Sequence, residues 1–167
     1  MKRLLFILAL VPAAAQAAPI ETRFIQATPT VTSASAYASG NTVGGLLTFP
    51  NACLIRTNKA QILSVKLYDK SKQGIDTDLV LFNATPAAQT DKTAFNPSNA
   101  ELLTITALIP LTTHKAFSAN GMSQTQSIIV PVNCTSSQSL VGYLVTRGTP
   151  TYAGTGDLTV EIETVAD

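Results

Sequence analysis

The sequence predicts an all-β fold: a single-domain antiparallel β-sandwich, jelly-roll-like, with one short helical turn near residues 96–103. Residues 140–145 are apolar on both faces, which is typical of a strand in the middle of a sheet. Residues 158–163 instead alternate between apolar and polar side chains, which predicts a strand with one face in water. About nine short segments of these kinds, separated by Gly, Pro and Asn turn signals, fit a sandwich or jelly roll.

The other strand-like segments follow one another along the chain. Residues 60–68 place Leu63, Val65 and Leu67 on one face, and residues 78–82 contain the apolar run 79–82, so we expect these two strands to pair as a hairpin across a charged turn. Asn96 can cap a helix and Pro97 is allowed at its first position, which predicts one helical turn before the next strand. The remaining expected strands are a weak one at 30–37, one at 43–49 with a bulge or a point of close backbone approach, one at 102–109 and one at 127–132, while 111–121 is ambiguous.

The first 17 residues have the pattern of a secretory signal peptide. A basic start is followed by an apolar run of eight residues, Leu4 to Val11, and by Ala15-Gln16-Ala17 as a small-residue cleavage site. The run is shorter than the roughly 20 residues that a membrane-spanning helix needs. We expect cleavage after Ala17, a periplasmic or secreted location and no membrane span; the alternative is a buried N-terminal strand or helix.

Residues 18–29 show little periodicity and contain Pro19 and Pro29. We expect an extended N-terminal arm that either covers its own domain or reaches a neighbouring subunit, with the sandwich domain formed by residues 30–167. Charged residues make up only 13% of the chain, and the formal net charge is +1. Because there is no basic cluster interleaved with aromatic residues, we expect no nucleic-acid partner.

The chain has two cysteines, Cys53 and Cys134. In an exported protein an even count predicts a disulfide, and two cysteines allow a single pairing. Two unrelated buried thiols are the alternative if the chain stays in a reducing cytosol. The pairing would place the Cys53 segment beside the start of the strand that follows Cys134.

The sequence contains no recognisable set of catalytic residues. His114 is the only histidine and lies in a polar stretch, and there is no G-x-S-x-G motif. Glu161 and Glu163 are two apart on one predicted strand and so share a face, but a solvated strand face explains them better than a paired-carboxylate site. A serine or threonine nucleophile cannot be picked out among so many hydroxyl residues. We expect a protein that is not an enzyme.

No metal or cofactor site is expected either. Residues 69–74 have the ligand and glycine spacing of the first half of a calcium loop, but Val80 stands where a bidentate glutamate is required. Three scattered His and Cys residues do not make a zinc site. Arg147, between the predicted central strand and a Gly/Pro turn, is expected to hold loop carbonyls or a carboxylate such as Asp157, or to anchor a neighbouring subunit.

Three segments, residues 63–86, 95–109 and 140–160, resemble a family of tailed-phage and prophage proteins usually encoded among head genes, beside the major capsid protein. The most specific is LVTRGTPTY followed by a small-residue turn and DLTV. The resemblance implies a non-enzymatic virion protein, a head decoration or cement protein bound in multiple copies to the major capsid protein or another virion protein. Arg147, Pro150 and Tyr152 match its pattern, as interface or turn residues.

Two features of this chain depart from that family, whose members generally lack an export signal and a cysteine pair. They favour a second hypothesis: an exported bacterial β-sandwich that binds a protein or glycan partner in the periplasm or at the cell surface.

Overall fold

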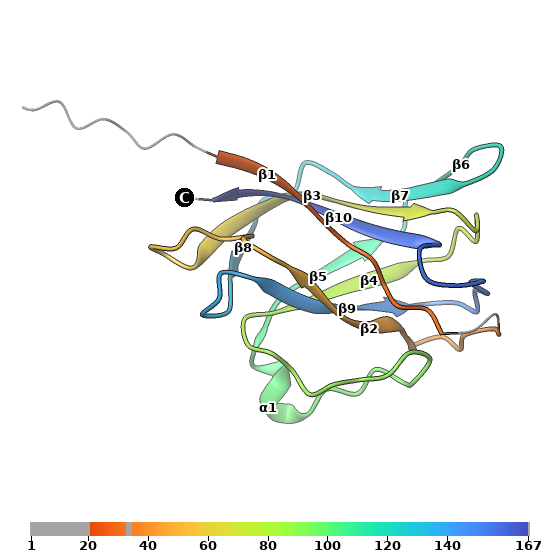
Figure 1. The fold of residues 1–167 in the computed structure, drawn as a ribbon, viewed down its shortest axis with the longest axis horizontal. Helices are drawn as coiled ribbons and strands as arrows, with labels where there is room; N and C mark the ends of the chain where they lie inside the picture. The colour runs from red at the N-terminus through yellow and green to blue at the C-terminus, as the bar shows by residue number, and fades with distance from the viewer. Residues whose placement is uncertain (1–20, 33–34, 167) are drawn as a thin grey trace, which may run out of the picture.

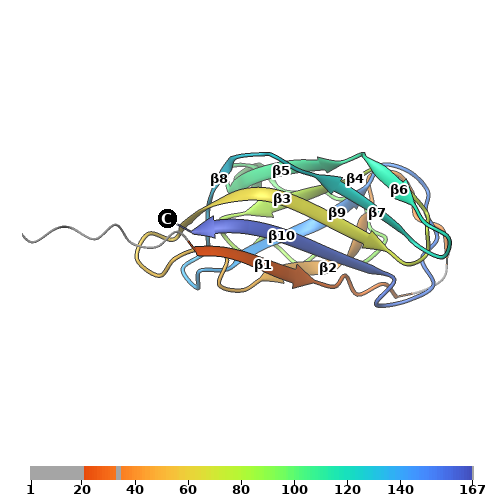
Figure 2. The ribbon, with the colours of Figure 1, turned by 90° about the horizontal axis from the view of Figure 1, so that it is seen from above.

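The protein is a sandwich of two antiparallel sheets (Figures 1 and 2). The computed structural model describes residues 21–32 and 35–166, so the predicted signal peptide at residues 1–17 lies outside the described residues. The larger sheet contains β1 (Glu21–Ala27), β10 (Leu158–Ala166), β3 (Lys59–Asp69), β7 (Gly121–Thr125) and β6 (His114–Ala116) in that order, and β8 (Val130–Asn133) pairs with the start of β3. The smaller sheet contains β2 (Thr42–Phe49), β9 (Leu140–Thr146), β4 (Thr77–Phe82) and β5 (Ile105–Leu111) in that order.

This architecture confirms the predicted all-β sandwich, while the jelly-roll connectivity stays a prediction. Strand β10 lies between β1 and β3 in the six-stranded sheet, and its alternating apolar residues point into the core. Fully buried core side chains come from both sheets: Ile62, Val65, Leu79, Leu81, Leu111, Leu140, Leu144, Leu158, Val160 and Ile162. In the part of the chain that the structure describes, no helix is long and apolar enough to cross a membrane.

The outer face of the four-stranded sheet is covered by the chain itself, which explains why β9 is apolar on both faces. Val141, Tyr143 and Val145 form a second apolar cluster outside that sheet, with Phe95 packed against it. The Tyr143 hydroxyl donates a hydrogen bond to the Ala87 carbonyl at 2.9 Å, and its ring lies 5.8 Å from that of Phe95. Residues 83–98 therefore form an extra layer on this side. No described segment lies over the outer face of the six-stranded sheet (Figure 2).

The expected hairpin between the strands at 60–68 and 78–82 is wrong. Strand β3 belongs to the six-stranded sheet and β4 to the four-stranded sheet, so the connection crosses the sandwich. The Asp69 carboxylate accepts hydrogen bonds from the backbone N–H groups of Gln73 at 2.6 Å and Gly74 at 3.1 Å, which fixes a turn at the end of β3. Because β4 is buried on both faces, it pairs with β9 and β5 inside the other sheet.

Three other segments differ from expectation in smaller ways. The segment expected as an N-terminal arm contains β1, an edge strand paired with β10 from Glu21 opposite Ala166 to Ala27 opposite Val160. The predicted strand at 30–37 contains no strand among its described residues. The strand expected at 127–132 begins only at Val130, since Ser127 has a left-handed φ of 57° that interrupts extended backbone.

The predicted helical turn is confirmed as α1 (Asn99–Leu102). Its N-cap is Ser98 rather than Asn96. Ser98 and Glu101 form a capping box, in which each side chain accepts a hydrogen bond from the backbone N–H of the other residue. None of the residues of α1 is buried.

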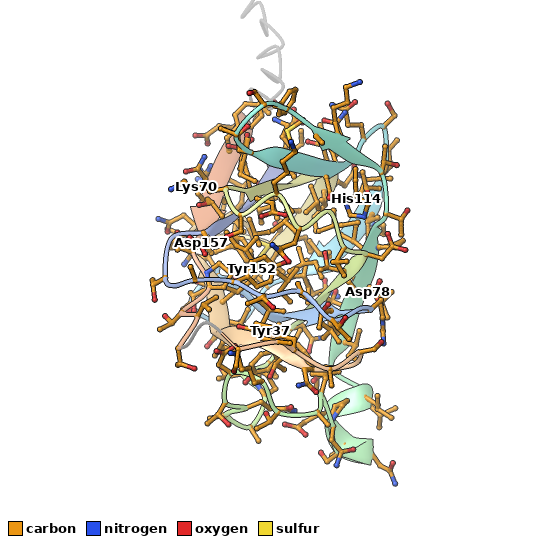
Figure 3. The ribbon with its side chains drawn as sticks, turned by 90° about the vertical axis from the view of Figure 1, so that its right-hand side faces the viewer. Tyr37, Lys70, Asp78, His114, Tyr152 and Asp157 are labelled. Carbon is orange, nitrogen blue, oxygen red and sulfur yellow. A yellow bond between two sulfur atoms is a disulfide. The ribbon has the colours of Figure 1, made fainter. Side chains whose placement is uncertain are left out.

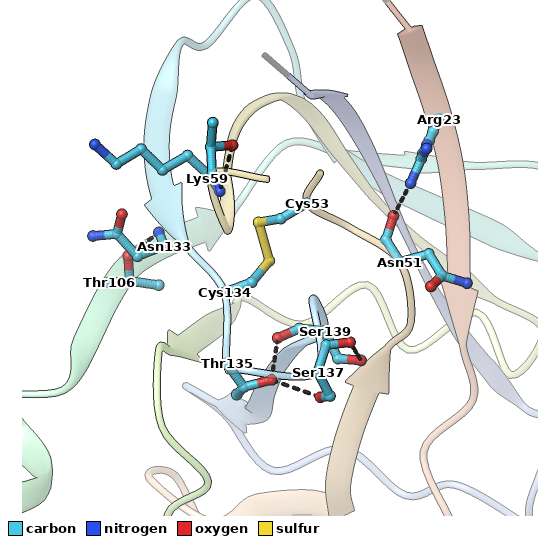
Figure 4. The surroundings of a disulfide bond; sticks show 11 residues. Arg23, Asn51, Cys53, Lys59, Thr106, Asn133, Cys134, Thr135, Ser137 and Ser139 are labelled. Atoms are coloured by element: carbon cyan, nitrogen blue, oxygen red, sulfur yellow. Dashed lines mark hydrogen bonds between the residues drawn. A yellow bond between two sulfur atoms is a disulfide. The ribbon is translucent and has the colours of Figure 1, made fainter. Parts of the chain in front are cut away.

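The predicted disulfide between Cys53 and Cys134 is present (Figure 4), with 6.1 Å between the two Cα atoms. It joins the segment after β2 to the segment after β8, 81 residues further along the chain. The Cys53 N–H also donates to the Gln138 carbonyl at 3.2 Å, so the Cys53 segment lies beside the start of β9, as expected. Close by, the Arg23 guanidinium of β1 donates to the Asn51 carbonyl at 2.6 Å.

Candidate functional site

Arg147, Pro150 and Tyr152 lie in the loop that follows β9. Figure 3 shows Tyr152 at one end of the sandwich, near Tyr37. Arg147 binds the carboxylate of Asp78, with Nε 2.6 Å from Oδ2, and not that of Asp157. The Pro150 carbonyl accepts a hydrogen bond from the Tyr37 N–H at 2.9 Å. Tyr152 is buried, with its ring 5.7 Å from that of Tyr37 in an edge-to-face arrangement. All three residues hold turns together.

Asp91 holds loops together at the same end of the sandwich. The carboxylate of Asp91 accepts hydrogen bonds from the Tyr37 hydroxyl at 2.7 Å, from the Gly44 N–H at 2.7 Å and from the Thr32 N–H at 2.9 Å. Burial by itself raises the pKa of Asp91, but these hydrogen bonds outweigh it and the net pKa is lowered. Burial first, and then the Asp91 carboxylate, raise the pKa of Tyr37 well above its ordinary range. The Asp91 carboxylate thus holds the segments that contain Tyr37, Gly44 and Thr32 next to one another.

His114 has partners that the sequence did not reveal. Its Nε2 lies 2.7 Å from Oδ1 of Asp76, and its Nδ1 is hydrogen-bonded to the Ser123 hydroxyl. Nε2 of the ring thus faces an acid, and Nδ1 faces a hydroxyl group. An acid, a histidine and a serine are therefore connected, although the two ring nitrogens have the opposite partners from those in a Ser-His-Asp hydrolase triad.

The surroundings of Ser123 do not suit a nucleophile. The residue is only 3% exposed, because it lies on the inward side of β7 opposite Leu67 of β3. The cavity beside it measures about 40 Å³ and is lined in part by His114 and Lys72. That volume holds a few water molecules, whereas substrate pockets usually measure about 300 Å³ or more. The three side chains tie β6 and β7 to the loop that crosses between the sheets.

Glu161 is the centre of a polar cluster on the uncovered face of the six-stranded sheet. Its carboxylate accepts hydrogen bonds from Lys66 Nζ at 2.9 Å, from Gln26 Nε2 at 2.8 Å and from the Tyr68 hydroxyl at 3.2 Å. The expectation that Glu161 and Glu163 both lie on a solvated strand face is thus wrong for Glu161, which is buried. The Glu163 carboxylate accepts a hydrogen bond from a serine instead. Period-two alternation predicts the face on which a residue lies, but not how far its neighbours cover it.

The charges in this cluster stabilise one another. Burial raises the pKa of Glu161, but the hydrogen bonds from Lys66 and Gln26 outweigh it, and the net pKa is lowered. The same hydrogen bond to Glu161 raises the pKa of Lys66, against a smaller opposing effect of burial. Burial and the Glu161 charge raise the pKa of Tyr68. At neutral pH Glu161 and Lys66 are therefore ionised and Tyr68 is neutral, which keeps the Tyr68 side chain in one position.

A groove of about 400 Å³ lies beside this cluster, at the end of the face formed by the β6–β7 turn. Tyr68 and Met122, which are opposite each other in register, line it together with Phe117 of the turn. Its polar lining includes Gln26, Asn120 and Thr159. We call this the β6–β7 groove. No local sequence pattern indicates the groove, because its lining residues come from separate segments of the chain.

A second exposed surface lies on the opposite side of the molecule. Leu102 and Leu103, at the end of α1, are 50% and 87% exposed. The turn that carries them is fixed by the capping box, and the Ala87 N–H donates a further hydrogen bond to Glu101. We call Leu102 and Leu103 the leucine turn. Large apolar side chains held rigidly in water are typical of contact sites for another macromolecule.

In the partial calcium-loop pattern at residues 69–74, the carboxylate and hydroxyl side chains already have other hydrogen-bond partners. Asp69 binds the backbone of its own turn, and the Ser71 hydroxyl donates to Asp157 at 2.7 Å. Across residues 21–32 and 35–166, no group of three or more His, Cys, Asp or Glu residues is placed to hold a metal ion.

Comparisons with known proteins leave the family open: no protein-family model matches this chain, and no curated protein matches it significantly.

Proposed function

We propose that this protein is a non-enzymatic structural protein of a phage particle, a head decoration or cement protein that binds the major capsid protein in multiple copies. The resemblance of residues 140–160 to phage head-gene products supports a location in the virion. A rigid β-sandwich suits a structural protein that is incorporated into a larger assembly. The observation that carries the proposal is the leucine turn: Leu103 is 87% exposed on a helical turn that is fixed by its own hydrogen bonds.

The leucine turn has the properties of a binding anchor. Fully burying a leucine side chain contributes about 1.5 to 3 kcal/mol. Because the capping box already orders the turn, little conformational entropy is lost when Leu102 and Leu103 enter a pocket on a partner. Many copies on one symmetric shell add avidity, so each contact can be weak.

Cosedimentation with capsids assembled from the major capsid protein tests this proposal. We expect the double substitution Leu102→Ser and Leu103→Ser to weaken capsid binding by at least about tenfold, since two buried leucines are lost. Because α1 buries none of its residues, the variant should keep the stability of the unmodified protein.

The matched control is Ile129→Ser, which changes a side chain that is 72% exposed and lines a groove on the six-stranded sheet with Ser64 and Glu163. Ile129→Ser should pellet with capsids as the unmodified protein does. Equal binding by the leucine variant would refute the role of the leucine turn, and failure of the unmodified protein to pellet would refute the capsid as partner.

The arrangement around Ser123 supports a non-enzymatic role. A serine nucleophile must reach a substrate carbonyl, and Ser123 is enclosed beside a cavity of about 40 Å³. We expect a fluorophosphonate reagent, which labels activated serines, to leave the folded protein unmodified. Trypsin in the same tube is the positive control. Labelling that disappears in Ser123→Ala and in His114→Ala would show a working nucleophile and overturn this part of the proposal.

The second candidate is an exported bacterial β-sandwich that binds a protein or glycan in the periplasm or at the cell surface. The Cys53–Cys134 disulfide favours it, because stable disulfides belong mainly to oxidising compartments. The capsid experiment separates the two candidates, since an export module has no reason to pellet with capsids.

A further inference from the structure

We propose that the β6–β7 groove is a saccharide-binding site. This inference goes beyond capsid attachment and does not depend on it. The groove lies on the uncovered six-stranded sheet, whereas α1 lies beyond the four-stranded sheet, on the other side of the sandwich (Figure 1). A particle or cell surface bound through the leucine turn would leave the groove open to solvent.

The groove contains a fixed aromatic platform. The Tyr68 hydroxyl is held by Glu161, which Lys66 and Gln26 hold in turn. An aromatic ring carries partial negative charge on its face, so it attracts the polarised C–H groups on one side of a sugar ring. Because Tyr68 is already in place, little ordering is needed when a ligand binds.

Phe117 supplies a second aromatic surface. It is 49% exposed at the β6–β7 turn, where its N–H donates to the Asn120 carbonyl at 2.7 Å. The turn therefore presents Phe117 and Asn120 together. In the groove, Tyr68 and Phe117 supply aromatic walls and Asn120 supplies an amide group.

The polar groups of the groove suit hydroxyl groups. The side chains of Asn120 and Thr159 have no hydrogen-bond partner within the described part of the chain, and Gln26 uses only its Nε2 on Glu161. These amide and hydroxyl groups both donate and accept, as sugar hydroxyls do. An apolar protein side chain in the groove would bury these amide and hydroxyl groups without hydrogen-bond partners, which costs free energy. A volume of about 400 Å³ is within the usual range for a small-ligand site.

A glycan array tests the proposal with the purified full chain. The probes are bacterial O-antigen and capsular polysaccharides together with neutral oligosaccharides of glucose, galactose and N-acetylglucosamine. We expect retention on at least one of these glycans, and titration calorimetry with that glycan should give a binding isotherm. Phe117→Ala and Asn120→Ala should each weaken binding by about tenfold, which is the loss of one stacking or hydrogen-bonding contact.

Leu103→Ser is the matched control, an exposed apolar side chain on the far side, and should bind the glycan normally. Circular dichroism should report folded protein for all variants, since Phe117 and Asn120 lie at an exposed turn. Retention on none of the glycans, or retention that neither groove variant reduces, would overturn the proposal. If Phe117→Ala instead abolishes capsid binding, the groove is a protein contact and the saccharide assignment is wrong. Capsid binding that depends only on the leucine turn leaves the two proposals separate.

Discussion

Replacing both cysteines by alanine is expected to lower the free energy of unfolding by about 4.5 kcal/mol. Cys53 and Cys134 are separated by 81 residues, and in the chain-entropy account a closed loop of this length strongly restricts the unfolded chain. Small domains have total stabilities of about 5 to 15 kcal/mol, so the double variant should be only marginally folded. Urea unfolding followed by circular dichroism gives the measurement.

The unmodified protein unfolded with a reducing agent is the internal control, because it loses the same cross-link without a change of sequence. Its midpoint should fall close to that of the double alanine variant. A loss below about 1 kcal/mol in both experiments would mean that the cross-link contributes little to stability, contrary to the chain-entropy account.

Gly142→Ala is expected to destabilise the protein by about 3 kcal/mol, the upper end of the usual cost of overpacking a core. A Cβ atom at Gly142 would lie 2.3 Å from the Val80 carbonyl oxygen and 2.9 Å from a methyl carbon of Leu81. The carbonyl belongs to β4, which is hydrogen-bonded between β9 and β5 and cannot move aside without breaking pairs in the middle of the sheet. The urea midpoint should fall accordingly.

Gly45→Ala is the matched control in the same sheet. A Cβ at Gly45 would meet no atom within 4 Å, and its φ is not in the left-handed region. This variant should stay within about 0.5 kcal/mol of the unmodified protein or gain slightly, because alanine restricts the unfolded chain. Equal losses in the two variants would show that the contact with Val80 is not what makes Gly142 necessary.

The fold class could be predicted because burial leaves its mark on local sequence. Residues 158–163 alternate because β10 has one core face, and residues 140–145 are apolar throughout because a layer of loop covers the outer face of β9. The sheet to which each strand belongs could not be predicted. Strand β4 is near β3 in sequence, but Asp69 turns the chain away and β4 completes the other sheet.

The disulfide could be predicted because two cysteines allow a single pair. The partners of His114 could not, since Asp76 is 38 residues away and Ser123 meets it only through the register of β6 and β7. Glu161 shows the same limit: the face it lies on follows from alternation, but its hydrogen bonds depend on which strands flank β10. The leucine turn had a local signal in the apolar pair after a predicted cap.

The pairing of β1 with β10 brings the two ends of the described chain together, with Glu21 opposite Ala166. A short peptide linker can therefore join them, and the chain can be reopened at another surface loop to give a circular permutant with the same sheets. Cargo joined directly before Glu21 or directly after Ala166 would emerge from this single pole of the molecule. The opposite pole, where the β6–β7 turn lies, would stay unobstructed (Figure 1).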